Sequence, residues 1–189
     1  RIAFGFKNVA VVHARDRAEA ETEEFVAPLK TARAVWFDGG DQTRLADTYL
    51  DTAVDREIHA LLDRGGVVGG TSAGTACQSE RMLTGEGDFT QVRTRSVELW
   101  DGLAFLPKDV VVDQHFLRRQ RQNRLLSVVL EHPELLGVGV DEETAIWVRP
   151  DGTFQGQIEV PPSQPGHCAL LVGCSSDAGS DEMRVVIVA

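Results

Sequence analysis

A serine between glycines is the first feature of this sequence that could do chemistry. Residues 70–74 read Gly-Thr-Ser-Ala-Gly and follow the short apolar run Val67–Val68. In this G-x-S-x-G pattern the glycines permit a strained turn between a strand and a helix, which exposes the serine hydroxyl beside free backbone amides. A phosphate-binding loop would need a lysine that does not follow here, and a serine that only caps the helix is the other alternative. The pattern therefore favours Ser72 as a nucleophile.

A nucleophilic serine needs a base, and the chain has five histidines. Three of them fall inside a predicted helix, at a helix end or in a Gly/Pro-rich turn, where packing or solvent contact is the usual role: His59, His132 and His167. His13 ends the first predicted strand and is a second candidate for the cleft. His115 follows the buried run 110–114 and reaches the same sheet edge as Ser72, so it is the favoured base.

Two carboxylates compete to orient that histidine. Asp113 lies two residues before His115, so the two side chains share a face if the strand continues. Glu142 follows the next apolar run, residues 137–140, and also stands at a strand end. Because triads are defined by the roles of their members and not by chain order, the residues alone leave this choice open.

Arginines crowd the segment after His115. The helix predicted over residues 117–131 carries Arg118, Arg119, Arg121 and Arg124. On a helical wheel Arg121 falls inside the apolar stripe, where a charge is costly unless it meets an anion. We therefore expect Arg121 and Arg124 to recognise an anionic group, whereas Arg118 fits a solvated surface.

The elements that must position these residues alternate between apolar runs and amphipathic segments. Strands are predicted over residues 8–12, 34–37, 67–68 and 110–113, and helices over residues 17–32, 52–64 and 117–131. This alternation predicts an α/β fold, in which a mainly parallel sheet has helices on both faces and binds ligands beyond the carboxyl ends of its strands. Further strands over residues 137–140, 145–148, 154–160 and 185–188 predict an antiparallel extension near the C-terminus. Residues 85–108 show no periodicity and predict a long loop.

Composition narrows the class of protein. A length of 189 residues suits one domain, and 42% hydrophobic with 25% charged residues is usual for a globular protein. The net charge of −10 disfavours a nucleic-acid partner, and no apolar run approaches the ~20 residues needed to span a membrane. The three cysteines fit neither a disulfide framework nor a zinc ribbon, so we expect a cytoplasmic protein without a metal or another cofactor.

Four motifs in this order resemble the cyanophycinase family. They are FDGGDQTRL over residues 37–45, GGTSAG over 69–74, DQHF over 113–116 with the arginines after it, and GVGVDEETA over 137–145. The resemblance spans roughly residues 8–150 and leaves residues 151–189 without a match. It implies a serine peptidase with the three-layer α/β/α fold of the class I glutamine amidotransferases, in a family that also includes aspartyl dipeptidases.

The resemblance also implies roles for single residues. It matches Ser72 to the nucleophile, His115 to the base and Glu142 to the orienting acid. Backbone N–H groups of Gly40 and Ala73 are the expected oxyanion donors. Six polar side chains are placed in the substrate site: Gln42, Asp113, Gln114, Arg119, Arg121 and Arg124. The implied activity is an exopeptidase that cuts cyanophycin, a poly-aspartate carrying arginine by isopeptide bonds, into β-aspartyl-arginine dipeptides.

The N-terminus departs from the family pattern. Family members normally begin with a strand that ends in a Gly-rich turn, a helix and another strand, before the position at which this chain starts. We therefore expect a single domain over residues 1–189 that lacks these first strands. Its open sheet edge would need a cover, and a homodimer is the assembly to test. The alternative functions are an aspartyl dipeptidase and a non-catalytic binding protein of the same family.

Overall fold

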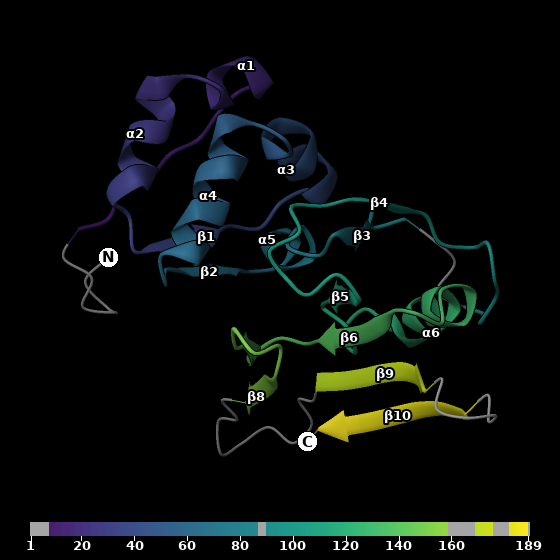
Figure 1. Cartoon of the computed structure of the whole chain (residues 1–189). Coiled ribbons are helices and arrows are strands. Elements are labelled where there is room, and N and C mark those ends of the chain that lie inside the picture. The colour runs from purple at the N-terminus through teal and green to yellow at the C-terminus, as the bar shows by residue number, and fades with distance from the viewer. Residues whose placement is uncertain (1–7, 87–89, 159–168, 176–181, 189) are drawn as a thin grey trace.

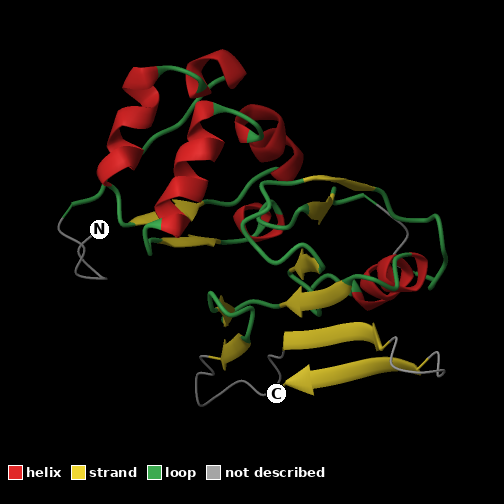
Figure 2. Cartoon of the chain, in the orientation of Figure 1, coloured by secondary structure: helices red, strands yellow, loops and turns green. Residues whose placement is uncertain are grey.

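Helices and strands are mixed up to residue 131, and the described residues after it form strands and loops (Figure 2). The computed structural model describes residues 8–86, 90–158, 169–175 and 182–188. The helices are α1 (Arg17–Ala20), α2 (Glu23–Thr31), α3 (Gln42–Tyr49), α4 (Ala53–Asp63), α5 (Ala73–Ala76) and α6 (Gln122–Glu131). The strands are β1 (Ala34–Phe37), β2 (Val67–Gly70), β3 (Arg81–Leu83), β4 (Leu99–Asp101), β5 (Val110–Gln114), β6 (Leu136–Val140), β7 (Thr144–Val148), β8 (Phe154–Ile158), β9 (Ala169–Ser175) and β10 (Glu182–Val188).

Two parallel strand pairs organise the fold. β1 pairs with β2, and β5 pairs with β6. The second pair continues through antiparallel β9 and β10, so its strand order is β10-β9-β6-β5. Figure 1 shows α1 to α4 gathered beside β1 and β2, whereas α6 lies beside β6. The predicted α/β fold is confirmed, and an antiparallel extension is present, although it is formed by β10 and by β9, which was not predicted. The strands predicted over residues 145–148 and 154–160 are β7 and β8, which pair with each other in a separate sheet and do not extend the main one.

Short polar side chains begin several of the helices. Thr52 caps α4 by accepting a hydrogen bond from the backbone N–H of Asp55, and Asp41 caps α3 in the same way. Val54, Ile58 and Leu61 then recur along α4 at helical spacing and are buried. These local signals explain why the helix predicted over residues 52–64 is confirmed.

Three predicted elements differ in the structure. Residues 8–12 form no strand, because none of the described strands pairs with them, and Val11 is 79% exposed. The helix predicted over 17–32 is divided into α1 and α2, because Thr22 caps a new helix by accepting from the N–H of Phe25. The helix predicted over 117–131 begins only at Gln122, so Arg121 is its N-cap and not part of its apolar stripe.

The segment predicted as a long loop contains a strand. β4 lies within residues 85–108 and pairs antiparallel with β3. A three-residue strand carries too little periodicity to be recognised in the sequence. Residues 159–160 of the strand predicted over 154–160, and His167, lie outside the described residues.

Two glycines of β6 allow close packing against the segment that follows β5 and against α6. A Cβ atom on Gly139 would lie 2.5 Å from the ring of Phe116, and one on Gly137 would lie 2.8 Å from a methyl group of Val129. Phe116, Val129 and Leu125 are fully buried in the same core cluster. The Gly-Val-Gly-Val run therefore allows β6, α6 and the end of β5 to pack closely.

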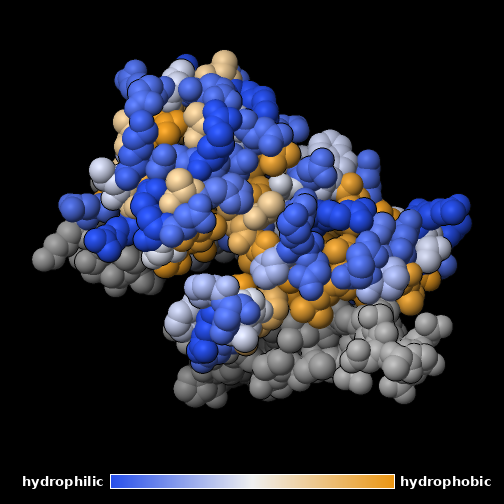
Figure 3. Space-filling view, in the orientation of Figure 1, coloured by the Kyte–Doolittle hydropathy of each residue, from blue (hydrophilic) through white to orange (hydrophobic). Residues whose placement is uncertain are grey.

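The surface is hydrophilic over most of the helices and hydrophobic in places between them. Figure 3 shows blue side chains over the helices beside β1 and β2, with orange surface in the region of these strands. Trp36 of β1 and Val67 of β2 are 67% and 62% exposed. Within the described ranges no helix is both long enough and apolar enough to cross a membrane.

Candidate active site

Ser72 stands in a sharp turn between β2 and α5. Its backbone has φ 54° and ψ −118°, a conformation that residues with side chains rarely adopt. A Cβ on Gly70 would lie 2.1 Å from the carbonyl oxygen of Gly74, and one on Gly74 would lie 2.2 Å from that of Phe37. Any side chain at either glycine would therefore collide with the backbone. The turn has the geometry of a nucleophile elbow.

Ser72, His115 and Glu142 form one chain of hydrogen bonds. Ser72 Oγ lies 2.9 Å from His115 Nε2, and His115 Nδ1 lies 2.6 Å from Glu142 Oε1. The three side chains come from the ends of β2, β5 and β6. In this arrangement the imidazole can accept a proton from the hydroxyl while the carboxylate orients its other nitrogen.

Glu142 is held in its charged form. Burial by itself raises the pKa of this carboxyl group, but hydrogen bonds from Asp141 and His115 outweigh burial and lower the pKa to about 2. Burial and the contact with Glu142 raise the pKa of Asp141, which accepts a hydrogen bond from the N–H of Arg118. Glu142 is therefore ionised at neutral pH, as an orienting acid must be.

Asp113, the other predicted acid, belongs to a buried ion pair. Its Oδ2 accepts a 2.9 Å hydrogen bond from Arg124 Nε, and its Oδ1 accepts one of 2.5 Å from Arg124 Nη2. Both side chains are 1% exposed. Asp113 would share a face with His115 only if the strand continued, and it does not, because β5 ends at Gln114 and His115 has φ 50°. Side chains therefore stop alternating at this point.

The other described histidines, His13, His59 and His132, have other surroundings than Ser72. His13 is in the exposed segment before α1, which forms no strand. His59 contacts the carbonyl oxygen of Leu103, and His132 contacts the guanidinium of Arg81. Of the described histidines, His115 is thus the one that reaches the serine hydroxyl.

A cavity of about 520 Å³ opens beside Ser72. Four of the predicted substrate-binding side chains line it: Gln42, Gln114, Arg119 and Arg121. Asp113 and Arg124 do not line it, because they are buried against each other behind the cavity wall. Residues 85–108 contribute Glu86, Glu98 and Trp100, which sequence reasoning missed because a loop without periodicity gives no sign of which side chains turn inward.

Arg121 is a buried cation at the cavity wall. Its side chain is 6% exposed, and its Nη1 donates to the carbonyl oxygen of Gln114 and, at 3.4 Å, to Asp113. Its Nε–H has no hydrogen-bond partner within the described residues. A buried guanidinium N–H at a cavity is a suitable donor for a carboxylate of a ligand.

The two predicted oxyanion donors belong to segments that adjoin Ser72. Gly40 lines the cavity and has φ 135°, which glycine adopts without strain. A Cβ on the preceding Gly39 would lie 3.4 Å from Ser72 Cβ, so this loop packs directly against the serine. Ala73 is the first residue of α5, where backbone N–H groups have no acceptor within the helix.

Among the described side chains around Ser72 there is neither a reactive thiol nor a metal-binding group. Cys77 follows α5 and is fully buried, and burial raises the pKa of its thiol to about 12. Such a thiol is not a competing nucleophile. Among the residues that the structure describes, no three His, Cys, Asp or Glu side chains are grouped to hold a metal ion.

Comparison with known proteins gives the family. The model of peptidase family S51 matches residues 3–155, and the chain belongs to this family. The chain is similar to the cyanophycinase of Synechococcus elongatus, with 39% identity over 152 residues, which cover 80% of this chain and 47% of that protein. It is 38% identical over 153 residues to the cyanophycinase of Nostoc sp. PCC 7120, covering 80% of this chain and 51% of that protein. The chain thus spans about half the length of the curated relatives it matches.

Solved structures share the fold at lower identity. A peptidase from an acI-B1 Actinobacterium aligns with a TM-score of 0.52 and 23% identity, over 84% of this chain and 57% of that one. A putative peptidase E from Listeria monocytogenes aligns with a TM-score of 0.53 and 16% identity, over 75% of this chain and 68% of that one. At these identities the likeness concerns the fold alone.

We expect the substitution Asp113→Asn to destabilise the protein strongly. It removes the negative charge that pairs with Arg124 in the interior, and breaking a buried ion pair costs about 3–5 kcal/mol. The free energy of unfolding in urea measures the loss. The matched control is Asp63→Asn at an exposed position, which we expect to change stability by less than about 0.5 kcal/mol. Equal stability of the two variants would contradict a structural role for Asp113.

Proposed function

We propose that this chain is a serine-type exopeptidase that hydrolyses cyanophycin to β-aspartyl-arginine dipeptides. The observation that carries the proposal is the hydrogen-bonded chain from Ser72 through His115 to Glu142, beside a cavity with two arginines in its wall. The name of its relatives, cyanophycinase, supports the substrate. We also propose that the chain is a single domain with the three-layer class I glutamine amidotransferase arrangement.

The proposed reaction follows from the contacts of the three residues. Ser72 Oγ attacks the carbonyl carbon of the scissile bond as His115 Nε2 removes its proton, and Glu142 stabilises the imidazolium through Nδ1. The N–H groups of Gly40 and Ala73 bind the oxyanion. His115 then donates the proton to the leaving amine, and a water molecule activated by His115 hydrolyses the acyl-enzyme.

Substrate recognition is divided between cavity residues and residues behind them. Arg119 and Arg121 bind a substrate carboxylate, and the amide groups of Gln42 and Gln114 bind neighbouring polar groups. Gln42 is oriented by its own hydrogen bond, in which Nε2 donates to the carbonyl oxygen of Leu83 at 3.0 Å. In this scheme the buried pair of Asp113 and Arg124 stabilises the fold, without touching the substrate.

We expect Arg121→Lys to raise KM for a substrate that carries a free carboxylate by about tenfold to a hundredfold. An ammonium group lacks the planar pair of N–H donors of a guanidinium, and hydrogen bonds to charged groups contribute about 1.5–3 kcal/mol. Steady-state kinetics measures the change. The control is Arg118→Lys at an exposed position outside the cavity, which should leave KM unchanged. Unchanged KM in both variants would remove Arg121 from substrate binding.

The proposal is tested by incubating the purified chain with cyanophycin and detecting soluble β-aspartyl-arginine by mass spectrometry. Release of the dipeptide supports a cyanophycinase, and cleavage of aspartyl dipeptides alone would favour the related dipeptidase activity. A fluorophosphonate probe separates both enzymes from a non-catalytic binding protein, because it labels only an activated serine. Size-exclusion chromatography with light scattering tests the proposed homodimer.

A further inference from the structure

Asp141 is a buried carboxyl group beside the active site that the proposed reaction does not use. It follows β6 directly, precedes Glu142 in the chain and is 9% exposed. Among the described residues, no lysine, arginine or histidine forms a salt bridge with it. A buried carboxyl group without a cation must be satisfied by hydrogen bonds. Its hydrogen-bond partners therefore show what it holds in place.

The first partner lies in the turn that follows His115. The backbone N–H of Arg118 donates to Asp141 Oδ1 at 3.3 Å. The N–H of Phe116 donates to the carbonyl oxygen of Val140 at 3.2 Å, so two hydrogen bonds join this turn to the end of β6. His115 has φ 50°, a conformation that surrounding contacts must hold. The Asp141 side chain supplies one of the contacts that fix this turn.

The second partner is the side chain of Glu142. Within the described residues, His115 and Asp141 are the two side chains that form hydrogen bonds with this carboxylate. The Glu142 side chain is 37% exposed, and a partly exposed glutamate has several rotamers unless contacts restrict it. The contact with Asp141 restricts Glu142 to the rotamer that reaches His115.

One proton makes the contact between the two carboxyl groups attractive. Two neighbouring carboxylates repel each other, whereas a carboxylic acid donates a hydrogen bond to a carboxylate. Burial and the contact with Glu142 raise the pKa of Asp141. Burial also raises the pKa of Glu142, but hydrogen bonds from Asp141 and His115 lower it to about 2. Of the two groups, Asp141 is thus the one that more readily holds the proton, and Glu142 keeps its charge for His115.

We propose that Asp141 is a positioning residue of this active site, which holds the Glu142 carboxylate against His115 and stabilises the turn that carries His115. It acts through these two residues and does not line the cavity beside Ser72. This role rests on the proposed function for the parts played by Ser72, His115 and Glu142, and it is independent of the identity of the substrate.

Two substitutions of Asp141 test this role. Asp141→Asn keeps an oxygen that can accept from the Arg118 N–H and gains an amide N–H that can donate to Glu142, whereas Asp141→Ala loses both contacts. We expect Asp141→Ala to slow the labelling of Ser72 by a fluorophosphonate about tenfold to a hundredfold, because a misplacement of ~1 Å can cost about a hundredfold in rate. Asp141→Asn should be labelled at close to the wild-type rate.

A proton resonance reports the same contact without any reaction. In protein labelled with ¹⁵N-histidine, a proton on His115 Nδ1 that donates to Glu142 at 2.6 Å gives a ¹H signal far downfield, because the hydrogen bond is short and its acceptor is charged. The wild type and Asp141→Asn should show this signal. In Asp141→Ala it should move upfield or disappear.

The first control is another buried acid. Asp55 on α4 is 7% exposed, and its Oδ2 accepts a hydrogen bond from the backbone N–H of Asp51 at 3.0 Å. It therefore matches Asp141 in burial and in accepting from the backbone, but it has no contact with Ser72, His115 or Glu142. Asp55→Ala should lower the free energy of unfolding and leave the labelling rate of the folded protein unchanged.

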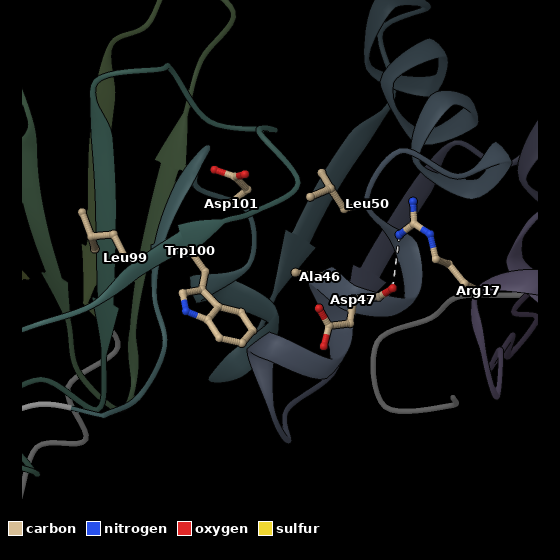
Figure 4. Close-up of a pocket in the computed structure, with 7 residues that line it drawn as sticks. All are labelled: Arg17, Ala46, Asp47, Leu50, Leu99, Trp100 and Asp101. Carbon is tan, nitrogen blue, oxygen red and sulfur yellow. Dashed lines mark hydrogen bonds between the residues drawn. The ribbon is translucent and has the colours of Figure 1, made fainter.

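The second control is an exposed acid at a second cavity. This cavity has a volume of about 630 Å³ and lies between α1, α3 and β4 (Figure 4). Trp100 lines both cavities, whereas Asp47 lines only the second. Arg17 donates to the backbone carbonyl oxygen of Asp47 at 3.2 Å, a contact that alanine retains. Asp47→Ala should be labelled like the wild type.

Two results would overturn the proposal. One is a wild-type labelling rate with an unchanged resonance in Asp141→Ala, and the other is an equal loss in Asp141→Asn and Asp141→Ala. If Asp141→Ala does not fold, Asp141→Val takes its place in the same comparison, because valine fills the space without hydrogen-bonding groups.

Kinetics with cyanophycin separates this role from the proposed function. Asp141→Ala should lower kcat and leave KM unchanged, since Asp141 does not line the cavity. If cyanophycin is not cleaved but labelling depends on Asp141 as expected, the proposed substrate fails and the positioning role stands. If the wild type is not labelled, the proposed serine mechanism fails, and the resonance alone decides whether Asp141 holds Glu142 against His115.

Discussion

Ser72→Ala should lose hydrolysis of cyanophycin by a factor on the order of 10⁴ or more, while the protein stays folded. The substitution removes the hydroxyl group that forms the hydrogen bond with His115 Nε2. The backbone turn is held by Gly70 and Gly74 and by contacts of α5, so it does not depend on that hydroxyl. Release of β-aspartyl-arginine, followed by mass spectrometry, measures the loss.

Two controls accompany the Ser72 variant. Its free energy of unfolding in urea should equal that of the wild type within about 0.5 kcal/mol, which shows that the fold is intact. A fluorophosphonate probe should label the wild type and not the variant, because Cys77 is buried with a raised pKa and offers no second nucleophile. Hydrolysis that survives in Ser72→Ala would rule out a serine mechanism.

Glu142→Gln should lower kcat by a factor on the order of 10³ to 10⁴ and leave KM nearly unchanged. The amide that replaces the carboxylate can donate a hydrogen bond to His115 Nδ1. The imidazole then carries its proton on Nε2, the nitrogen that faces Ser72, and cannot accept the proton of the hydroxyl. The substitution also removes the charge that stabilises the imidazolium. The Glu142 pKa of about 2 means that the wild-type carboxylate is ionised throughout the neutral range, so this defect should persist from pH 6 to pH 9.

The matched control for this variant is Glu24→Gln, an exposed position on α2 that lines neither cavity. It should leave kcat unchanged. The comparison with Asp113→Asn decides the identity of the acid, because that variant should lose stability and keep the turnover of its folded fraction. A variant of Asp113 that folds normally and loses turnover, beside a Glu142 variant with normal kcat, would assign the acid to Asp113.

Local features of this protein could be read from the sequence because their causes are local. A side chain at Gly70 or Gly74 would collide with backbone atoms a few residues away or on the adjoining strand. The G-x-S-x-G pattern therefore predicted the turn at Ser72 directly. Thr52 and the apolar stripe behind it marked α4 in the same way. His115 was predicted because the carboxyl ends of parallel strands meet at one edge, a rule that needs only the order of elements.

The tertiary structure decided which charged residues form a buried pair, which contact His115 and which line the cavity. Whether Asp113 or Glu142 faces His115 depends on where β5 ends and on the buried partner that Arg124 supplies to Asp113. Arg121 was expected in a helical stripe, yet it stands at the cap of α6, where the preceding turn moves its guanidinium to the cavity wall.

The two cavities meet through a residue that no pattern identified. Trp100 lies on the short strand β4 within a segment without periodicity, and its pairing with β3 places it between α3 and the loop after β3. Such a side chain is positioned by contacts between segments far apart in the chain, and these contacts leave no local signal in the sequence. For that reason the sequence by itself was enough to predict that Ser72 and His115 meet, whereas the shape and charge of the surface around them came only from the packing of the chain.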